Sequence, residues 1–352
     1  MFSKFIFLSW LFCILLMNTK YMAVILSTTY WVASCSPTNF PPIKIDPAYT
    51  RVAQATGGQV FVVNPNETSL LFNLFKPTLK GNRDHLLFLQ DTHSATAKTY
   101  TIPADSTITD MTFSITSDAL SMAKVFRPSG AEVLPIDPSV TITRLPTAKI
   151  VEITKPEAGT WELSVSGTGQ LSMSVSGTSS ISFHDFNFVE ERGRLGHTGL
   201  FPIVGEPIRS DTPAWATAFI TGKIATANFE LLALDNRLIR PIELHKGTGE
   251  VAIDEFFGAF TLPTEPFRVS VKGVDQAGKA FMRVYPKVFT AQTVKIVSET
   301  LWLKLNRQGP PKINFTVTNY GAVGQFTISA TQMMGLAQTT PSAINLGTNQ
   351  PT

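Results

Sequence analysis

The chain has 352 residues, of which 43% are hydrophobic and 16% are charged, and it contains 23 glycines and 23 prolines. This composition excludes a disordered chain and a coiled coil. The formal net charge is only +3 and no block of basic residues occurs, which excludes the electrostatic surface of a nucleic-acid binder. We therefore expect globular, strand-rich domains and no nucleic-acid partner.

The N-terminus has the pattern of a targeting segment. Residues 5–17 are apolar except for Ser9 and follow Lys4, which gives the charge and length of a signal peptide. We assign residues 1–21 to a signal peptide or N-terminal hydrophobic segment. A second apolar stretch at residues 22–26 leaves a membrane tether as the alternative, although Lys20 interrupts a continuous span.

Cysteines and sequons agree with a place outside the cell, secreted or at the cell surface. Cys13 and Cys35 are the two cysteines of the sequence, too few for a disulfide framework. The sequons at Asn66 and Asn314 would accept glycans in a secretory compartment. We therefore expect a glycoprotein whose fold depends on its packing.

Residues 22–92 alternate between predicted strands and predicted helices. Helices are expected over residues 48–55 and 67–79, and short apolar strands over residues 59–63 and 86–89. An order of strand, helix, strand, helix, strand is typical of an α/β fragment.

Period-two alternation takes over in the next segment, residues 97–188. Trp161, Leu163 and Val165 alternate with polar residues, the stretch Gly167-Thr-Gly169-Gln170 has turn chemistry, and a second alternating run follows. We predict a hairpin here, with one apolar and one hydroxyl-rich face, inside an immunoglobulin-like β-sandwich. Further strands are expected at residues 99–102, 111–115, 123–126 and 149–153.

A second immunoglobulin- or fibronectin-like sandwich is predicted for residues 195–290. Its closing hairpin turns at Asp275-Gln-Ala-Gly278, and the charged stretch from Glu190 to Arg194 is predicted to link the two sandwiches. Residues 296–335 begin an incomplete third β domain, and residues 336–352 have the composition of a disordered tail. Strands of the second sandwich are expected at residues 216–220, 229–234, 239–244, 267–271 and 281–284.

Two stretches carry a family resemblance. Residues 46–63 resemble the closing helix and last strand of a von Willebrand factor A domain of the hemicentin-like kind, and Lys155-Pro-Glu-Ala-Gly-Thr-Trp161 is similar to the β-sandwich that follows this domain. The resemblance implies an extracellular matrix or surface protein that adheres to other extracellular proteins. An A domain binds its divalent cation through an Asp-x-Ser-x-Ser loop, which does not occur before Asp46, so we expect no metal-ion adhesion site.

No motif predicts a catalytic, metal or cofactor site. Asp137-Pro-Ser139-Val-Thr141 is interpreted as a turn, and the five histidines lack metal-ligand spacing. His184-Asp185 near Ser182 has no nucleophile elbow, and Gly247-Thr-Gly249 lies between predicted strands rather than before a helix. Trp161 is predicted to fill the core.

These patterns lead to one prediction and two alternatives. We predict a mainly β protein, with tandem immunoglobulin-like β-sandwiches preceded by a partial α/β von Willebrand factor A domain. Its expected function is non-enzymatic adhesion or matrix assembly through protein contacts. The alternatives are a secreted hydrolase or carbohydrate-binding protein with accessory β-sandwiches, and a truncated fragment without function.

Overall fold

Every regular element that the structure assigns is a β-strand. The structure is a computed structural model, and it describes residues 13–18, 21–26, 31–35, 59–63, 83–93, 96–145, 148–194, 197–209, 212–247, 254–298, 314–332, 335–337 and 343–349. No helix is assigned within these residues, and the predicted mainly β, sandwich-type fold class is confirmed. The helices expected at residues 48–55 and 67–79 lie outside the described ranges.

The first sheet consists of four short strands near the N-terminus. β1, β2 and β3 are antiparallel neighbours, whereas β3 and β4 run parallel. Parallel neighbours need a crossover connection, which the long segment between β3 and β4 can supply. The strands are β1 (Cys13–Asn18), β2 (Tyr21–Leu26), β3 (Trp31–Cys35) and β4 (Gln59–Val63).

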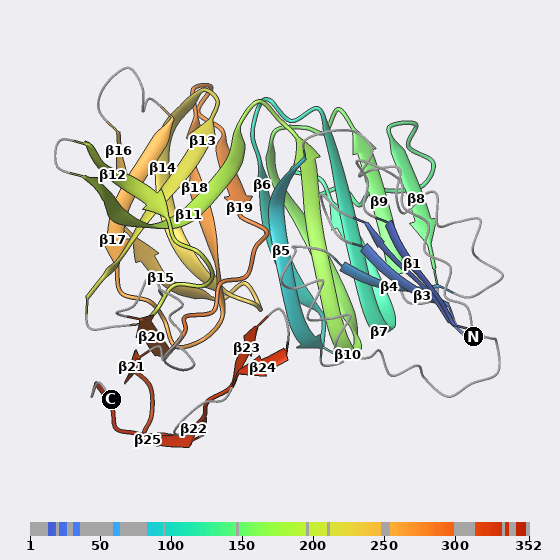
Figure 1. The fold of residues 1–352 in the computed structure, drawn as a ribbon. Helices are drawn as coiled ribbons and strands as arrows, with labels where there is room; N and C mark the ends of the chain where they lie inside the picture. Colours follow the sequence, from blue (N-terminus) through green and yellow to red (C-terminus); the bar gives the residue numbers. More distant parts are fainter. Residues whose placement is uncertain are drawn as a thin grey trace. The chain divides into compact units, whose positions relative to one another are not determined.

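A six-stranded sheet follows, with the order β5-β10-β7-β9-β8 and β6 added to β10 (Figure 1). One edge of β10 pairs with β7, and its other edge pairs with β6 in the first half and with β5 in the second. Residues 86–89, predicted as part of the α/β segment 22–92, therefore belong to this sheet. The strands are β5 (Asp84–His93), β6 (Lys98–Ala104), β7 (Asp110–Phe126), β8 (Val140–Arg144), β9 (Ala148–Thr154) and β10 (Gly159–Thr178).

β10 is a single strand of 20 residues, so the hairpin predicted here is wrong. Between Gly167 and Gln170 the register with β7 shifts, and Gly169 takes a φ of 87°. These residues form a bulge because both halves of β10 pair with the same long neighbour. Likewise, the strands predicted at residues 111–115 and 123–126 are parts of the one strand β7.

Alternation along β10 places its apolar side chains in a dry core. Trp161, Leu163 and Val165 have no exposed surface, as the core interpretation of Trp161 predicts. The indole Nε1 of Trp161 donates to the backbone oxygen of Glu157 at 2.9 Å, and its ring centroid lies 6.1 Å from that of Phe113. The one polar atom of this large side chain is thus satisfied, which is what burial of an indole requires.

Two further sheets have the orders β12-β11-β13-β17-β16 and β15-β14-β18-β19 (Figure 1). The linker predicted from Glu190 to Arg194 is wrong. These residues form the end of β11 and pair with β12. The strands are β11 (Ser182–Arg194), β12 (His197–Pro202), β13 (Ala214–Thr221), β14 (Ile224–Ala233), β15 (Leu238–Ile242), β16 (His245–Lys246), β17 (Glu255–Phe260), β18 (Phe267–Asp275) and β19 (Ala280–Val284).

The predicted hairpin between β18 and β19 is confirmed. The two strands are antiparallel, and the backbone N–H of Asp275 donates to the oxygen of Lys279 at 2.8 Å. Gly278 takes a φ of 76°, a conformation that favours glycine and explains the turn signal in the sequence.

The chain divides into two compact units, which are described separately. The first comprises Met1–Asn187, Ala216–Gly258 and Glu265–Phe289, and the second comprises Phe188–Trp215, Ala259–Thr264 and Thr290–Thr352. This division cuts through the domain predicted at residues 195–290. The six-stranded sheet and the sheet of β14, β15, β18 and β19 therefore lie in one unit.

Within the first unit, a buried ion pair joins the end of β6 to β19. The Arg283 Nη2 atom donates to Asp105 Oδ2 at 2.5 Å, and neither side chain has exposed surface. The next residue, Ser106, donates its hydroxyl to Asp275 Oδ2, also at 2.5 Å. These polar contacts fix the loop after β6 against the β18–β19 hairpin.

The C-terminal residues of the second unit form strand pairs. Residues 336–352 are predicted to be disordered, but Ala343–Leu346 pairs with β22 and the Leu346 side chain is buried, so the prediction is wrong for these residues. The pairs are β20 (Val294–Ser298) with β21 (Phe315–Asn319), β22 (Gly324–Thr327) with β25 (Ala343–Leu346), and β23 (Ala330–Gln332) with β24 (Gly335–Ala337).

Candidate functional site

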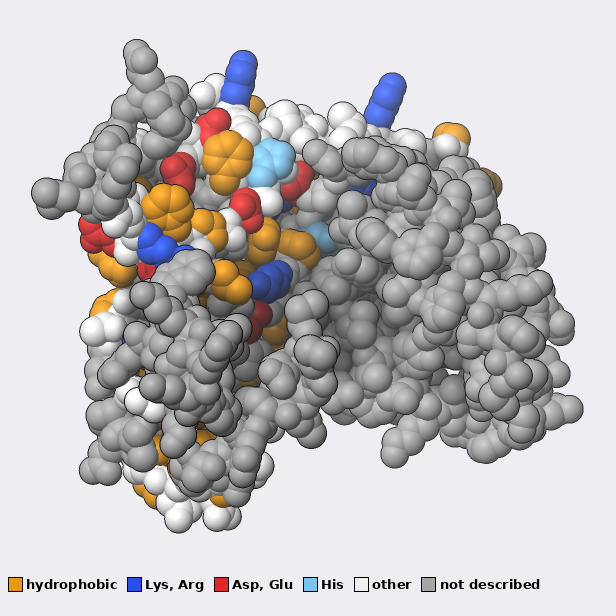
Figure 2. Space-filling model, viewed as in Figure 1, with side chains coloured by type: hydrophobic (Ala, Val, Ile, Leu, Met, Phe, Trp, Pro, Cys, Tyr) orange, Lys and Arg blue, Asp and Glu red, His pale blue; other side chains and the backbone are white. Residues whose placement is uncertain are grey.

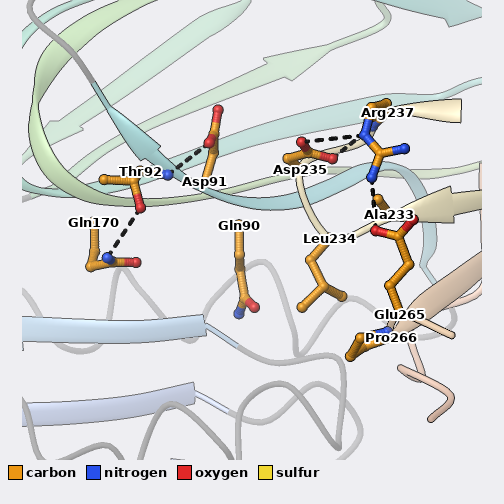
Figure 3. A pocket seen from close by; sticks show the side chains of 10 residues that line it. All are labelled: Gln90, Asp91, Thr92, Gln170, Ala233, Leu234, Asp235, Arg237, Glu265 and Pro266. Carbon is orange, nitrogen blue, oxygen red and sulfur yellow. Dashed lines mark hydrogen bonds and ion pairs between the residues drawn. The ribbon is translucent and has the colours of Figure 1, made fainter.

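A shallow hollow of about 400 Å³ lies in the first unit, where the end of β5 meets the turn after β14 (Figure 3). Figure 3 shows Asp235, Arg237 and Glu265 grouped at one end, and Thr92 and Gln170 at the other. The hollow is polar, with side chains from four separate segments. Its lining residues are Gln90, Asp91, Thr92, Gln170, Ala233, Leu234, Asp235, Arg237, Glu265 and Pro266.

Local backbone structure explains how these segments meet. The backbone N–H of Gln90 donates to the oxygen of Leu234 at 2.7 Å, which ties β5 to the turn after β14. In that turn Asn236 has a φ of 68°, which asparagine tolerates better than most residues, and Asp235 Oδ1 accepts the N–H of Arg237 at 3.0 Å. The bulge in β10 brings Gln170 to the rim, where its Nε2 donates to Thr92 Oγ1 at 3.3 Å.

The hollow is acidic. It contains three carboxylates, Asp91, Asp235 and Glu265, against the single guanidinium of Arg237. Arg237 Nη2 donates to Glu265 Oε2 at 2.7 Å, and Lys98 donates to Asp91 Oδ2 at 2.5 Å. The hydrogen bond to Asp91 raises the pKa of the Lys98 ammonium, so this ammonium stays charged at neutral pH. Asp235 leaves the hollow with an excess of negative charge, which disfavours an anionic ligand.

One buried acceptor also belongs to the hollow. The Gln90 Oε1 atom is buried and has no hydrogen-bond partner among the described residues. Because water cannot reach this oxygen, a ligand in the open hollow cannot reach it either. The binding capacity of the hollow therefore comes from its exposed carboxylates, Arg237 and Gln170.

Exposed aromatic side chains form a second surface feature, on the five-stranded sheet. Phe219 on β13 and Phe257 on β17 are 42% and 38% exposed, and the ring of His184 on β11 lies 5.8 Å from that of Phe219. Figure 2 shows hydrophobic side chains among acidic and basic ones on the part of the surface that is coloured by type. Aromatic residues are enriched where proteins contact one another, so this face is suited to a partner.

The constellation at Ser182, His184 and Asp185 does not have the order of a catalytic triad. Ser182 donates to Asp84 Oδ1 at 2.7 Å and lies 3.4 Å from His184 Nδ1, while His184 Nε2 contacts Thr221 Oγ1 at 2.8 Å. In a triad the carboxylate accepts a hydrogen bond from the histidine, whereas here Asp84 accepts one from the serine. Asp185 accepts from the hydroxyl of Tyr285 instead, and burial, together with Asp185, raises the pKa of Tyr285 to about 12.

The stretch that begins at Asp137 forms the predicted turn. Asp137 Oδ1 accepts from the N–H of Ser139 at 3.0 Å and from its hydroxyl at 2.7 Å, and Oδ2 pairs with Arg127. These hydrogen bonds from Ser139 hold the pKa of Asp137 below its ordinary value. Throughout the described ranges, no three side chains of His, Cys, Asp or Glu gather as they would around a metal ion.

The remaining sequence predictions fall in strands or outside the described ranges. Asn314 is exposed just before β21, where a glycan could attach, and Asn66 lies outside the described residues. Gly247 follows β16, which pairs with β17, so strands flank the glycine-rich stretch as expected. Among the described residues, no helix is long and apolar enough to cross a membrane.

The hollow has no overall signal in the sequence. Its charged residues come from three segments without a common spacing, and the single local signal is the Asp235-Asn-Arg237 turn chemistry. The buried Arg268 and Arg283 do have a local signal, because each is a charged residue inside an otherwise apolar strand.

Comparisons with known proteins identify one part of the chain. The chain is similar to the solved structure of the Bacillus licheniformis lipase BlEst2 in propeptide form, at 10% identity and a TM-score of 0.27, over 63% of this chain and 48% of that one. It thus spans about half the length of the lipase, and a likeness this weak carries no argument. No curated protein matches the chain significantly. Residues 85–180, which contain β5 to β10, match the family described as hemicentin galactose-binding domain-like, so this segment is a hemicentin-like β-domain.

Proposed function

We propose that the chain is a non-enzymatic extracellular adhesion or matrix protein that binds other extracellular proteins. The observation that carries the proposal is the acidic hollow on the hemicentin-like β-domain, at the junction with the turn after β14. Hemicentin-like domains suggest an extracellular setting, in agreement with the leader-like N-terminus and the exposed sequon at Asn314.

Charge favours a basic side chain of the partner as the group that enters the hollow. Asp235 and Glu265 share the guanidinium of Arg237, so one of the two carboxylates can pair with an incoming lysine or arginine. Arginine and aromatic residues dominate protein interfaces, and the exposed aromatic face of the five-stranded sheet offers additional contact area.

A neutral carbohydrate is the second candidate ligand. The matched family is described as galactose-binding domain-like, and the hollow combines carboxylates, a guanidinium and the amide of Gln170. Such groups are the hydrogen-bonding partners that sugar hydroxyls need. The excess of carboxylates argues for an uncharged sugar over an acidic one.

Binding measurements on the full chain test both candidates. We would immobilise purified extracellular-matrix proteins and measure binding of the parent, of the double variant Asp235→Asn/Glu265→Gln, and of Glu162→Gln as a matched control on exposed β10 surface. The expected result is a loss of at least tenfold in affinity for the double variant and none for the control. Equal binding by all three proteins contradicts the proposal.

A titration with free D-galactose separates the two ligand classes. Saturable binding of galactose that the double variant loses would favour carbohydrate recognition. Absence of galactose binding, together with matrix binding that weakens as salt is raised, would favour a basic protein partner, because screening reduces charge attraction.

A further inference from the structure

Two arginines of the first unit are buried in neighbouring strands, and one of them has no hydrogen-bond partner for its guanidinium among the described residues. Arg268 on β18 is 1% exposed. None of its three guanidinium nitrogens has a hydrogen-bond partner among the residues that the structure describes. Its guanidinium lies over the Phe88 ring, whose centroid is 4.3 Å from the guanidinium carbon.

Two more buried polar atoms without a hydrogen-bond partner in the described residues lie on β18 and β5. Ser270 follows two positions later on β18, on the same side of the strand, and its fully buried hydroxyl also has no partner in the described residues. On β5, the ring of His85 packs edge-on against Phe88 at 5.5 Å, and its buried Nδ1 atom is unsatisfied as well. Phe88 is thus flanked by a guanidinium and an imidazole.

The environment penalises charge. Burial, with the nearby cations Arg268 and Arg83, lowers the pKa of His85 to about 4, so the imidazole is neutral at physiological pH. Burial lowers the pKa of Arg268 to about 9, which still leaves its guanidinium charged at pH 7. Arg83 is neutralised by Asp110, whereas Arg268 has no carboxylate within ion-pair distance among the described residues.

A buried cation without a counter-charge is unfavourable, and native proteins compensate it with an ion or water. Arginine offers five N–H donors and no acceptor, and serine adds an O–H donor. The complementary ligand is therefore rich in acceptors and negatively charged. Because the side chains around it are nearly fully buried, it must also be small.

We propose that Arg268 and Ser270 form an internal binding site for a small monovalent anion, a halide or a one-carbon carboxylate. The anion accepts hydrogen bonds from the guanidinium edge and the Ser270 hydroxyl, while the guanidinium face rests on Phe88. This site is separate from the acidic hollow, whose carboxylates repel anions, and it stabilises the packing of β18 against β5.

Thermal unfolding of the full chain in different sodium salts tests the proposal. We would compare chloride and formate with the bulky anion gluconate at constant ionic strength and pH 7.5. A ligand that binds only the folded state raises the melting temperature by about 2–4 °C for each tenfold increase above its dissociation constant. Chloride or formate should produce this rise and gluconate should not, and the difference between the two active salts reports whether the site fits a sphere or a planar carboxylate.

Two single variants test whether the anion that raises the melting temperature binds at Arg268. Arg268→Met should abolish the response to the small anions, whereas Arg144→Met, which removes an exposed arginine of β8 in the same unit, should retain it. Because Arg268→Met can fail to fold, ³⁵Cl NMR of the unmodified protein supplies a second readout: chloride linewidth should increase and formate should reverse the increase. An unmodified protein that melts at the same temperature in all three salts and leaves the chloride line unbroadened overturns the proposal, as does an unchanged response in Arg268→Met.

Discussion

Arg283 and Arg268 occupy neighbouring strands of one sheet and are equally buried, yet they lie in opposite electrostatic surroundings. Arg283 donates to Asp105 Oδ2, to the Ser179 hydroxyl at 2.8 Å, and to the backbone oxygens of Ile181 and Met282 at 3.0 and 2.9 Å. Arg268 has the ring of Phe88 on one face and no hydrogen bond in the described part of the chain.

Two arginines with the same burial can therefore have different roles, because the role depends on which polar groups lie within reach of the guanidinium. Arg283 faces the loop after β6 and the start of β11, which supply a carboxylate, a hydroxyl and carbonyl groups. Arg268 faces β5, whose nearby residues Phe88 and His85 supply an aromatic ring and a neutral imidazole. The first arginine fixes two segments together, and the second leaves capacity for a ligand.

Removing the partner of Arg283 should produce the largest effect. Asp105→Ala leaves a buried guanidinium without its counter-charge, and we expect the free energy of unfolding to fall by about 3 to 5 kcal/mol. Chemical denaturation of the full chain at pH 7 measures the change. In the double variant Asp105→Leu/Arg283→Met both charges of this ion pair are removed, so most of the loss should be recovered; a double variant less stable than Asp105→Ala would contradict this account.

Lowering the pH should destabilise the surroundings of Arg268, which include His85, more than those of Arg283. His85 has a pKa of about 4 in the fold because of burial and the nearby arginines, against about 6.5 in an unfolded chain. Below pH 6.5 the His85 imidazole binds a proton in the unfolded state but stays neutral in the folded state. The free energy of unfolding therefore decreases as the pH falls from 6.5 to 4, by up to about 3 kcal/mol.

A variant without the titrating ring tests the acid effect. His85→Gln should lose less stability between pH 7 and pH 4.5 than the parent, as measured by denaturant unfolding at each pH. His245→Gln, at an exposed position on β16, is the matched control and should behave like the parent. If His85→Gln and the parent show the same pH dependence, the imidazole is not the group responsible.

Sequence patterns predict strands well where the signal is local. Trp161 in the core and the turn at Gly278 follow from alternation and turn chemistry. The bulge at Gly167 has the glycine signal of a hairpin turn, because glycines favour both, and the choice between them depends on the distant strand β7. The hollow could not be predicted because Asp91, Asp235 and Glu265 are brought together only by the packing of separate strands.

The smallest expected effect concerns the residue next to Asp105. The Ser106 hydroxyl donates to Asp275 at the end of β18. The Ser106 side chain is exposed, so water can take its place as a donor to Asp275 when the hydroxyl is removed. Ser106→Ala should therefore lower the free energy of unfolding by about 1 kcal/mol, well below the loss expected for Asp105→Ala. Denaturant unfolding under the same conditions gives both values. If Ser106→Ala cost as much as Asp105→Ala, the β6 loop would be held by the whole hydrogen-bond network, and the buried charge of Arg283 would have no special weight in fixing it.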